Sequence, residues 1–333
     1  MKAFGRGGTV ILLVGHLLFW LPMQSASAGQ DPPAVSLRQL AGRVEISVGG
    51  QAVAAYVYED PAIPRPYFCQ VKTPQELAVT RPNPPDPLVN KGNDDHPAFH
   101  PGIWLAFGDL GGEDFWRNKA RVRHVRFVES PAEEPGHGEF TVENEYLGGN
   151  GSVVCRETCT YSVHSDAPNA WLLMSRSEFR SDTAGFAFGD QEEMGLGIRL
   201  NTPITVKFGS GKILNSEGGQ NEKGTWGKPA RWCAAWGSVE GRTAAIAVMP
   251  APDNFRPCWF HTRDYGLIVA NPFGVKAMTA PEDPAVPPAV TTVDKGEVFT
   301  LTFGIWISDG QAGVAPAFDS AYEKYLKLLA QRQ

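Results

Sequence analysis

Most of the chain shows the two-residue alternation of apolar and polar positions that is typical of β-strands. Two hairpins are predicted, because alternating segments surround the glycine-rich turns 49–50 and 148–151. In the segment 299–307 every second residue is apolar, which indicates a strand with one face buried in a core. The strands predicted in this way are 43–58 (two strands about the first turn), 139–147, 152–164, 171–179, 243–249, 267–270 and 299–307.

The C-terminal segment differs, because its apolar residues recur at helical spacing. Phe318, Tyr322, Tyr325 and Leu329 lie three or four residues apart, which predicts a helix with one apolar face. We expect this helix to cover an edge or an end of a sheet. The fold is therefore predicted to be all-β: one large antiparallel β-sandwich domain, residues 29–333, with a C-terminal helix.

Long segments without a clear period separate the predicted strands. They are rich in polar and aromatic residues, and loops of this length in a compact domain are usually functional or ordered by packing. These predicted loops are 60–104, 108–118, 181–199, 212–236 and 250–266.

Composition and charge exclude two classes of protein. Of the 333 residues, 42% are hydrophobic, so the chain can bury a substantial core and is not disordered in bulk. The net charge of −6 and the absence of a long Lys/Arg run argue against a nucleic-acid partner.

The N-terminus has the pattern of a secretory signal peptide. Lys2 and Arg6 precede an apolar run, and Ala26 and Ala28 supply the small residues of a cleavage site. A membrane anchor is the alternative, but the apolar run is shorter than the roughly 20 residues that span a bilayer. We expect a signal peptide over residues 1–28, export to the periplasm or the extracellular space, and no membrane insertion after cleavage.

Five cysteines remain after such a cleavage, and an odd number leaves at least one thiol without an intramolecular partner. Cys155 and Cys159 lie on one face of the same predicted strand, about 13 Å apart by strand rise, so they cannot bond to each other. We expect most of the cysteines to be small buried hydrophobic residues.

Two histidines beside a carboxylate form the first candidate for chemistry. His96 and His100 follow Asp95, and such a group can bind a metal or transfer protons near neutral pH. Pro97 and Pro101 argue against the helix on which an i, i+4 histidine pair binds zinc, so the cluster is predicted to be a loop.

A second candidate is the pair of adjacent glutamates in the segment 189–199. If this segment is a strand, Glu192 and Glu193 point to opposite faces and only one enters a given pocket. A glutamate beside Arg199 would remain ionised, whereas one in an apolar cleft would be a better general acid. His261, in a later loop, offers a third histidine.

Aromatic residues among amides and carboxylates suit saccharides, because sugar C–H faces stack on rings while polar groups bind the hydroxyls. Asp109 has an alternative role, since an aspartate before a glycine-rich segment often caps a turn. The substrate-binding candidates are Asp95, His100, Trp104, Asp109, Trp116, Arg199, Trp226, Lys228, Arg263, Asp264 and Asn271.

Four motifs in this order resemble the PmoA-like family, a secreted domain of unknown function that is often labelled methane oxygenase. They are DHPAFHPGIW (95–104), GDQEEMGLGIRL (189–200), NSEGG with WGKPARWC (215–233) and HTRDYGLIVANPFG (261–274). The resemblance covers roughly residues 60–308. It implies a sandwich similar to the galactose-mutarotase supersandwich, on which sugar-active enzymes use His and Glu or Asp as acid and base without a cofactor.

The leading functional hypothesis is an exported carbohydrate-active enzyme: a hydrolase, lyase or epimerase that acts on glycans or modified sugars. In this hypothesis His96 and His261 exchange protons, Glu192 or Glu193 is the partner acid or base, and no cofactor is expected.

Two alternatives remain open. One is a non-catalytic glycan-binding protein that stacks sugars on exposed tryptophans, and the other is a metal-dependent, oxygenase-type enzyme with a divalent metal. The tryptophans would be Trp104, Trp116, Trp226 and Trp259, and the metal ligands His96, His100 and His261.

Overall fold

The computed structural model describes residues 1–5, 7–8 and 31–332. Met1–Asp31 and Pro32–Gln333 are separate units, and everything below concerns the second. The predicted signal peptide and its cleavage site lie outside the described residues, apart from a few residues at the start. Among the described residues, none of the helices has the length and apolar character needed to cross a bilayer.

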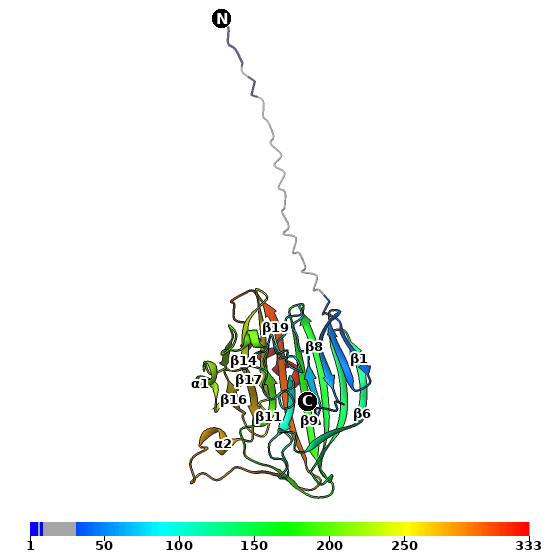
Figure 1. Ribbon diagram of the computed structural model, residues 1–333. Coiled ribbons are helices and arrows are strands. Elements are labelled where there is room, and N and C mark those ends of the chain that lie inside the picture. Colours follow the sequence, from blue (N-terminus) through cyan, green and yellow to red (C-terminus); the bar gives the residue numbers. More distant parts are fainter. Residues whose placement is uncertain (6, 9–30, 333) are drawn as a thin grey trace. The chain divides into compact units, whose positions relative to one another are not determined.

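Two large antiparallel sheets make up this unit (Figure 1). In spatial order, the nine-stranded first sheet contains β1 (Val35–Leu40), β2 (Arg43–Val48), β3 (Gln51–Val57), β4 (Tyr67–Cys69), β5 (Ile103–Phe107), β11 (Met194–Arg199), β17 (Leu267–Asn271), β16 (Trp259–Arg263) and β13 (Lys228–Pro229). The eight-stranded second sheet contains β12 (Lys212–Asn215), β14 (Cys233–Val239), β15 (Arg242–Pro250), β19 (Val298–Gly310), β9 (Ala170–Arg180), β8 (Val153–Ala167), β7 (His137–Leu147) and β6 (Arg121–Glu134).

Short elements complete the unit. Among the described residues, a two-stranded sheet pairs β10 with β18, the helices α1, α2 and η1 lie in connections between strands, and α3 follows the last strand. Their bounds are β10 (Phe186–Phe188), β18 (Thr291–Val293), α1 (Asn221–Thr225), α2 (Val275–Thr279), α3 (Phe318–Ala330) and η1 (Thr202–Ile204).

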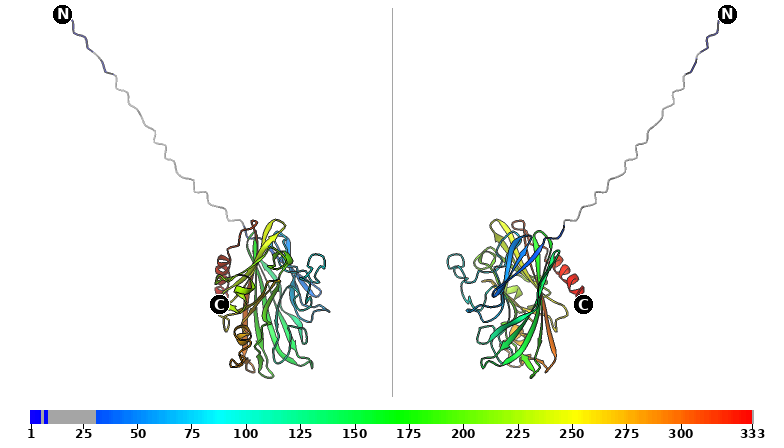
Figure 2. Two further views of the ribbon diagram at one scale, coloured as in Figure 1. Left: turned by 60° about the vertical axis from the view of Figure 1, so that its left-hand side comes forward. Right: turned by 90° about the vertical axis from the view of Figure 1, so that its right-hand side faces the viewer.

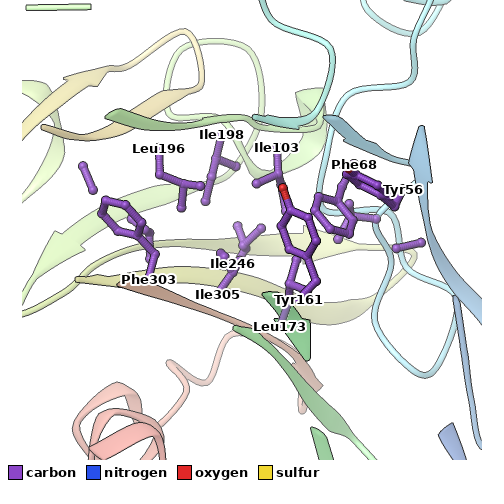
Figure 3. Packing of buried hydrophobic residues seen from close by; sticks show 14 of the residues in the cluster. Tyr56, Phe68, Ile103, Tyr161, Leu173, Leu196, Ile198, Ile246, Phe303 and Ile305 are labelled. Carbon is purple, nitrogen blue, oxygen red and sulfur yellow. The ribbon is translucent and has the colours of Figure 1, made fainter. Parts of the chain in front are cut away.

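The core lies between the two large sheets. Figure 3 shows Leu196 and Ile198 of β11 pointing toward Ile246 and Ile305 of the second sheet, and all four side chains are buried. Because alternate residues of a strand point to opposite faces, the odd-numbered residues of β11 must face outward. Gly197 and the residues paired with it on the adjacent strands therefore belong to the outer face of the first sheet.

The predicted all-β sandwich with a C-terminal helix is confirmed. The turn at 49–50 joins β2 to β3, and the turn at 148–151 joins β7 to β8. The predicted place of the helix is wrong, because α3 covers the outer face of the second sheet rather than an edge (Figure 2). It packs there because outward residues such as Met174 and Met249 are apolar.

Several strands lie in segments that were predicted to be loops. β11 is the most important of them, because both of its faces are buried and its glycines interrupt the apolar alternation. A strand covered on both sides shows no polar face from which its period can be recognised. The strands missed within predicted loops include β4, β10, β11, β12, β13 and β16.

The cysteines fulfil the expectation of small buried residues. All five are free thiols, and Cys155 and Cys159 both point from β8 into the core. Cys69 is half-buried, and burial raises the pKa of its thiol to about 11. These thiols are therefore packing residues rather than nucleophiles.

A buried carboxyl group in the core gives the first prediction. Glu157 of β8 is 3% exposed, Asn144 Nδ2 donates to its Oε2 at 3.0 Å, and burial raises its pKa. For an acid with a raised folded pKa, the stabilising contribution is complete below the unfolded pKa and is lost as pH rises through the folded pKa. We expect Glu157→Gln to raise the free energy of unfolding at pH 7 by about 1–3 kcal/mol.

Thermal unfolding followed between about pH 4 and pH 7 checks this, because the gain in Tm should shrink toward acid pH. The matched control is Glu145→Gln on the outer face of the same sheet. Glu145 pairs with Arg123 and Arg156, which lower its pKa, so its replacement should destabilise at pH 7. A Glu157→Gln variant that is less stable than the wild type at pH 7 would contradict the prediction.

Candidate functional site

One row of residues crosses the outer face of the first sheet, and all four of its members are buried. In register across β5, β11, β17 and β16, Trp104 pairs with Gly197, Gly197 with Val269, and Val269 with His261. Neighbouring strands lie about 4.8 Å apart, so the backbones of Trp104 and His261 are about 14 Å apart. An indole and an imidazole thus stand on either side of two smaller residues.

The side at β5 is an aromatic stack. The His100 ring stacks on Trp104, with centroids 5.1 Å apart, and Trp116 meets Trp104 edge-on at 5.2 Å. The exposed ring of His96 contacts His100 at 5.6 Å. Gly197 makes room for this stack, since a Cβ there would lie only 2.5 Å from Trp104 Cζ2.

Buried nitrogens with no hydrogen-bond partner gather on this face. Among the described residues, no group bonds to Nε1 of Trp104 or Trp116, or to Nε2 of His100 or His261. Buried polar atoms in folded proteins are nearly always hydrogen-bonded, so each such atom calls for an explanation. Three of them lie in the stack at β5 and the fourth on β16, and a polar ligand is one way to satisfy such atoms.

His261 is held with one ring nitrogen open. Its Nδ1 lies 3.1 Å from the backbone oxygen of Glu192, which can only accept, so Nδ1 carries the proton. Asn271 Nδ2 fixes the same peptide by donating to the oxygens of Gln191 at 2.7 Å and Glu192 at 3.2 Å. Burial lowers the pKa of His261 to about 4, so the ring is neutral near pH 7 and Nε2 offers a lone pair.

Both adjacent glutamates reach this region. They lie in the bend before β11 rather than on a strand. The prediction that only one of them enters a pocket assumed a strand and therefore does not apply. The Glu192 carboxylate lies 3.4 Å from the Arg263 guanidinium and 4.0 Å from His261 Nδ1. Glu193 pairs with Arg117.

Glu193 has the properties of a general acid. Burial raises the pKa of its carboxyl group, the Arg117 guanidinium lowers it, and the neighbouring Glu192 carboxylate raises it again. Burial is the largest of these effects, so the net direction is upward. A carboxyl group that keeps its proton above the usual pH range can donate it to a leaving oxygen.

Arg199 anchors the loop that carries the first histidines. Its guanidinium is fully buried, donates to Asn93 Oδ1 at 2.6 Å, and forms an ion pair with Asp95. It also lies over the Tyr265 ring, 4.5 Å from the centroid. Tyr265 links the two sides of the site, because the charges at both Arg199 and Arg263 act on its hydroxyl.

His100 complements His261. Its Nδ1 lies 3.5 Å from Arg199 Nη1, which can only donate, so Nδ1 accepts and Nε2 carries the proton. Burial, reinforced by the charges of Arg199, Arg65 and Arg81, holds the pKa of His100 well below its ordinary value. His100 is therefore a neutral donor and His261 a neutral acceptor.

Arg65 and Arg81 were missed by sequence reasoning. Arg81 donates to the backbone oxygens of Asn93 at 2.6 Å and Asp95 at 2.8 Å, and Arg65 donates to that of Trp116 at 2.9 Å. Both therefore hold the loops that carry the stack. Nothing in the pattern marks them, because an arginine in a polar loop is normally exposed. Arg117 and Tyr265 were missed although they lie beside candidate residues.

Three predicted binding residues have structural roles. Asp109 Oδ1 accepts from Gly112 N at 3.0 Å and so caps a turn, which is the alternative foreseen for it. Asp264 Oδ1 accepts from Glu222 N at 2.8 Å, at the start of α1. Asn271 acts through the Glu192 peptide. Each of the three side chains binds a backbone group of the protein itself.

The predicted stacking platforms are partly wrong. Trp104 is 1% exposed and Trp116 is fully buried, because His100 covers one ring and the two indoles pack against each other. Trp226 is half-buried with Arg263 over its ring at 5.6 Å, and Lys228 is exposed on the edge strand β13. The tryptophans of β5 and its loop therefore offer an N–H group rather than an open ring face.

The three predicted metal ligands do not form one group. His96 and His100 are neighbours at the β5 end of this face. His261 lies on β16 of the same face, where its Nδ1 is bound to the backbone oxygen of Glu192. In the part of the chain that the structure describes, no three His, Cys, Asp or Glu side chains are placed to hold a metal ion.

A shallow hollow of about 530 Å³ adjoins Glu192 and opens toward α2. Asp190 lines it and caps α2 by accepting from the backbone nitrogens of Lys276 at 2.8 Å and Ala277 at 3.0 Å. A similar hollow of about 550 Å³ lies on the outer face of the second sheet. Charged residues there pair with one another, as Arg180 does with Asp182, so we place the site on the first sheet.

A family model matches residues 43–320, which include the sheet face described above. Its description is "Family of unknown function (DUF6807)". The chain belongs to DUF6807. The resemblance to a PmoA-like family is wrong, since the family match gives no indication of it. The four short motifs behind that resemblance lie within the DUF6807 match.

Among curated proteins, none matches this DUF6807 chain. It is similar to a crystal structure of β-arabinopyranosidase, with 10% identity and a TM-score of 0.34, over 83% of this chain and 38% of that one. It is also similar to a galactose mutarotase-like protein from Lactobacillus casei, with 7% identity and a TM-score of 0.35, over 82% and 99% of the two chains.

A GalM/aldose epimerase homologue from C. elegans shows 10% identity and a TM-score of 0.32, over 84% of this chain and 100% of that chain. Galactose mutarotase-like proteins are thus among the solved structures to which the DUF6807 chain is similar. The likeness is too distant to transfer a residue role, and the chain spans 38% of the glycosidase.

The second prediction concerns Gly197. We expect Gly197→Ala to displace the Trp104 ring and with it the His100 stack, at a cost of about 1–3 kcal/mol in the free energy of unfolding. Thermal unfolding and near-ultraviolet circular dichroism of the tryptophans measure both effects. Gly310→Ala is the control, because nothing lies within 4 Å of a Cβ there. Unchanged Tm and tryptophan signals in Gly197→Ala would contradict the prediction.

Proposed function

We propose that this protein is an exported carbohydrate-active enzyme, a hydrolase, lyase or epimerase, whose active site is the outer face of the first sheet between β5 and β16. The buried nitrogens without partners support this most directly. Sugar hydroxyls both donate and accept hydrogen bonds, and these nitrogens offer both: donors at Trp104, Trp116 and His100, and an acceptor at His261.

We assign the proton transfers to His261 and Glu193. The neutral imidazole of His261 has a free Nε2 lone pair and acts as the base on a water, a hydroxyl or a C–H group. The protonated Glu193 carboxyl group acts as the acid on the departing or ring oxygen. Glu192 positions the imidazole through its backbone oxygen and faces Arg263.

In this proposal His96 does not take part in the proton exchange with His261 that the sequence predicted. Its side chain is 56% exposed and lies at the rim, in edge-on contact with His100. We therefore give it a role in receiving the sugar, together with Asp95, while the buried base does the chemistry.

Glycan binding without chemistry is the second candidate. The ion pair between Glu193 and Arg117 favours it, because the guanidinium stabilises the ionised form of Glu193, which has no proton to donate. The two candidates differ in product formation alone.

A product search with a matched variant separates them. The full chain is incubated with a panel of neutral and acidic oligosaccharides, mass spectrometry detects hydrolysis or elimination, and NMR in D₂O detects epimerisation. We expect a product from the wild type and none from a His261→Gln/Glu193→Gln double variant that unfolds at a similar temperature. Saturable binding without any product would support the binding protein, and an equally active double variant would overturn the assigned residues.

A further inference from the structure

Three arginines lie buried beneath the His100 end of the site. Arg65, Arg81 and Arg199 are 3%, 1% and 0% exposed, yet they come from different parts of the chain. Asp95 faces two of them: it is paired with Arg199 and lies 3.7 Å from Arg81, and its side chain is 43% exposed. Arg81 and Arg199 therefore share one half-exposed negative charge, and Arg65 forms no ion pair with a described residue.

More distant carboxylates do not make up the difference. Asp94 is exposed, and Asp114, which acts on Arg65, already pairs with Arg117 and Lys119 at 3.3 Å each. The buried guanidinium groups donate largely to backbone oxygens, which satisfy hydrogen bonds but carry no net charge. A buried charge without a counter-charge is costly.

The pKa values reflect, first of all, the cost of burying these charges. Burial lowers the pKa of Arg65 to about 9 and that of Arg81 to about 10, and Arg199 adds to the effect on Arg81. Asp95 opposes the effect on Arg81 without cancelling it.

Buried donors of the arginine and imidazole side chains at this end have no partner among the described residues. They are Nε of Arg65, Arg81 and Arg199 and Nε2 of His100, in residues that are at least nine-tenths buried, and they add to the indole nitrogens of Trp104 and Trp116. At the other end of the site, Glu192 and Glu222 both face Arg263. The site is therefore polarised, with unsatisfied cationic donors near β5 and carboxylates near β16.

We propose that the saccharide bound here is anionic, and that its carboxylate or sulfate group is received at the end formed by His100 and Arg199. This rests on the proposed function and narrows its substrate class. The anion supplies the charge that Asp95 only partly provides. The carboxylates beside Arg263 repel it, which fixes the direction in which the sugar lies.

Titration calorimetry of the full chain tests the proposal with three probes: trigalacturonate, galactose 6-sulfate and the neutral galactotriose. We expect trigalacturonate or galactose 6-sulfate to bind at least about 10-fold more tightly than galactotriose, with a preference that falls as salt is added. The tighter of the two anionic probes identifies the group as carboxylate or sulfate. Equal affinities for charged and neutral probes would overturn the proposal.

Asp95→Asn gives a second test, whose expected result differs from the result that a merely structural role of Asp95 would give. Removing the carboxylate that now neutralises Arg199 should raise the affinity for the preferred anionic probe by about 3- to 10-fold and leave galactotriose no tighter. Asp94→Asn, its exposed neighbour, is the control with a smaller expected change. An Asp95→Asn variant that binds both kinds of probe more weakly by the same factor would contradict the proposal.

The two proposals fail in different ways. Binding or conversion of neutral sugars alone removes the anionic substrate and leaves the carbohydrate function intact. No binding and no conversion of any saccharide removes both.

Discussion

His261→Gln lowers kcat on the saccharide that the wild type converts by about 10²- to 10⁴-fold, the range typical for loss of a general base. The physical reason is the fixed tautomer: Nδ1–H donates to the Glu192 oxygen, so the lone pair of Nε2 is the group that can accept a proton. The glutamine side chain fills similar space but is not a base. Little change is expected in KM, because the hydroxyl-binding donors across the site remain.

The same assignment predicts a particular pH dependence. The base must be neutral, so the acid limb of kcat/KM should lie at about pH 4, the pKa that burial gives His261. Below that pH the imidazole is protonated and the rate falls, and the limb should vanish in His261→Gln. His137→Gln is the control, because that ring stacks on His164 on the second sheet. A His261→Gln variant with the wild-type rate and acid limb would refute the role of this residue.

The parts of the fold that could be predicted have one polar and one apolar face. The hairpins at 49–50 and 148–151 and the helix α3 show this difference directly in the sequence. β11 could not be predicted, because Gly197 has no side chain to show a face and stands there to admit the Trp104 ring. That requirement comes from a strand about 90 positions away, and no local pattern contains it.

Part of the candidate site could be selected from the sequence, and the residues that support it could not. His100, His261 and Glu193 were selected because they lie in segments dense in polar residues. Arg65 and Arg81 could not be found, because the burial of a guanidinium depends on carbonyl groups supplied by other loops. For the same reason the tryptophans were expected to be exposed, since a sequence does not show what covers a ring.

Glu193→Gln is expected to lower kcat by about 10²- to 10⁴-fold, because the amide cannot donate the proton that the leaving or ring oxygen needs. The alkaline limb of the pH profile should vanish with it. Glu193 must be protonated, so in the wild type this limb lies at its pKa, which burial places above the ordinary value of 4.5. Because His261 is neutral only above about pH 4, activity is expected between that pH and the alkaline limb.

Two neighbouring substitutions should move this limb in opposite directions. Arg117→Met removes the positive charge that lowers the pKa of Glu193, so the alkaline limb should shift to higher pH. Glu192→Gln removes a negative charge that raises the pKa values of Glu193 and His261, so both limbs should shift to lower pH. Profiles of kcat/KM for the three proteins measure this. Opposite shifts in the two variants would identify an electrostatic effect on Glu193, because a change of fold alone would not move the limb upward in one variant and downward in the other. An alkaline limb that stays in place in both variants would mean that another group donates the proton.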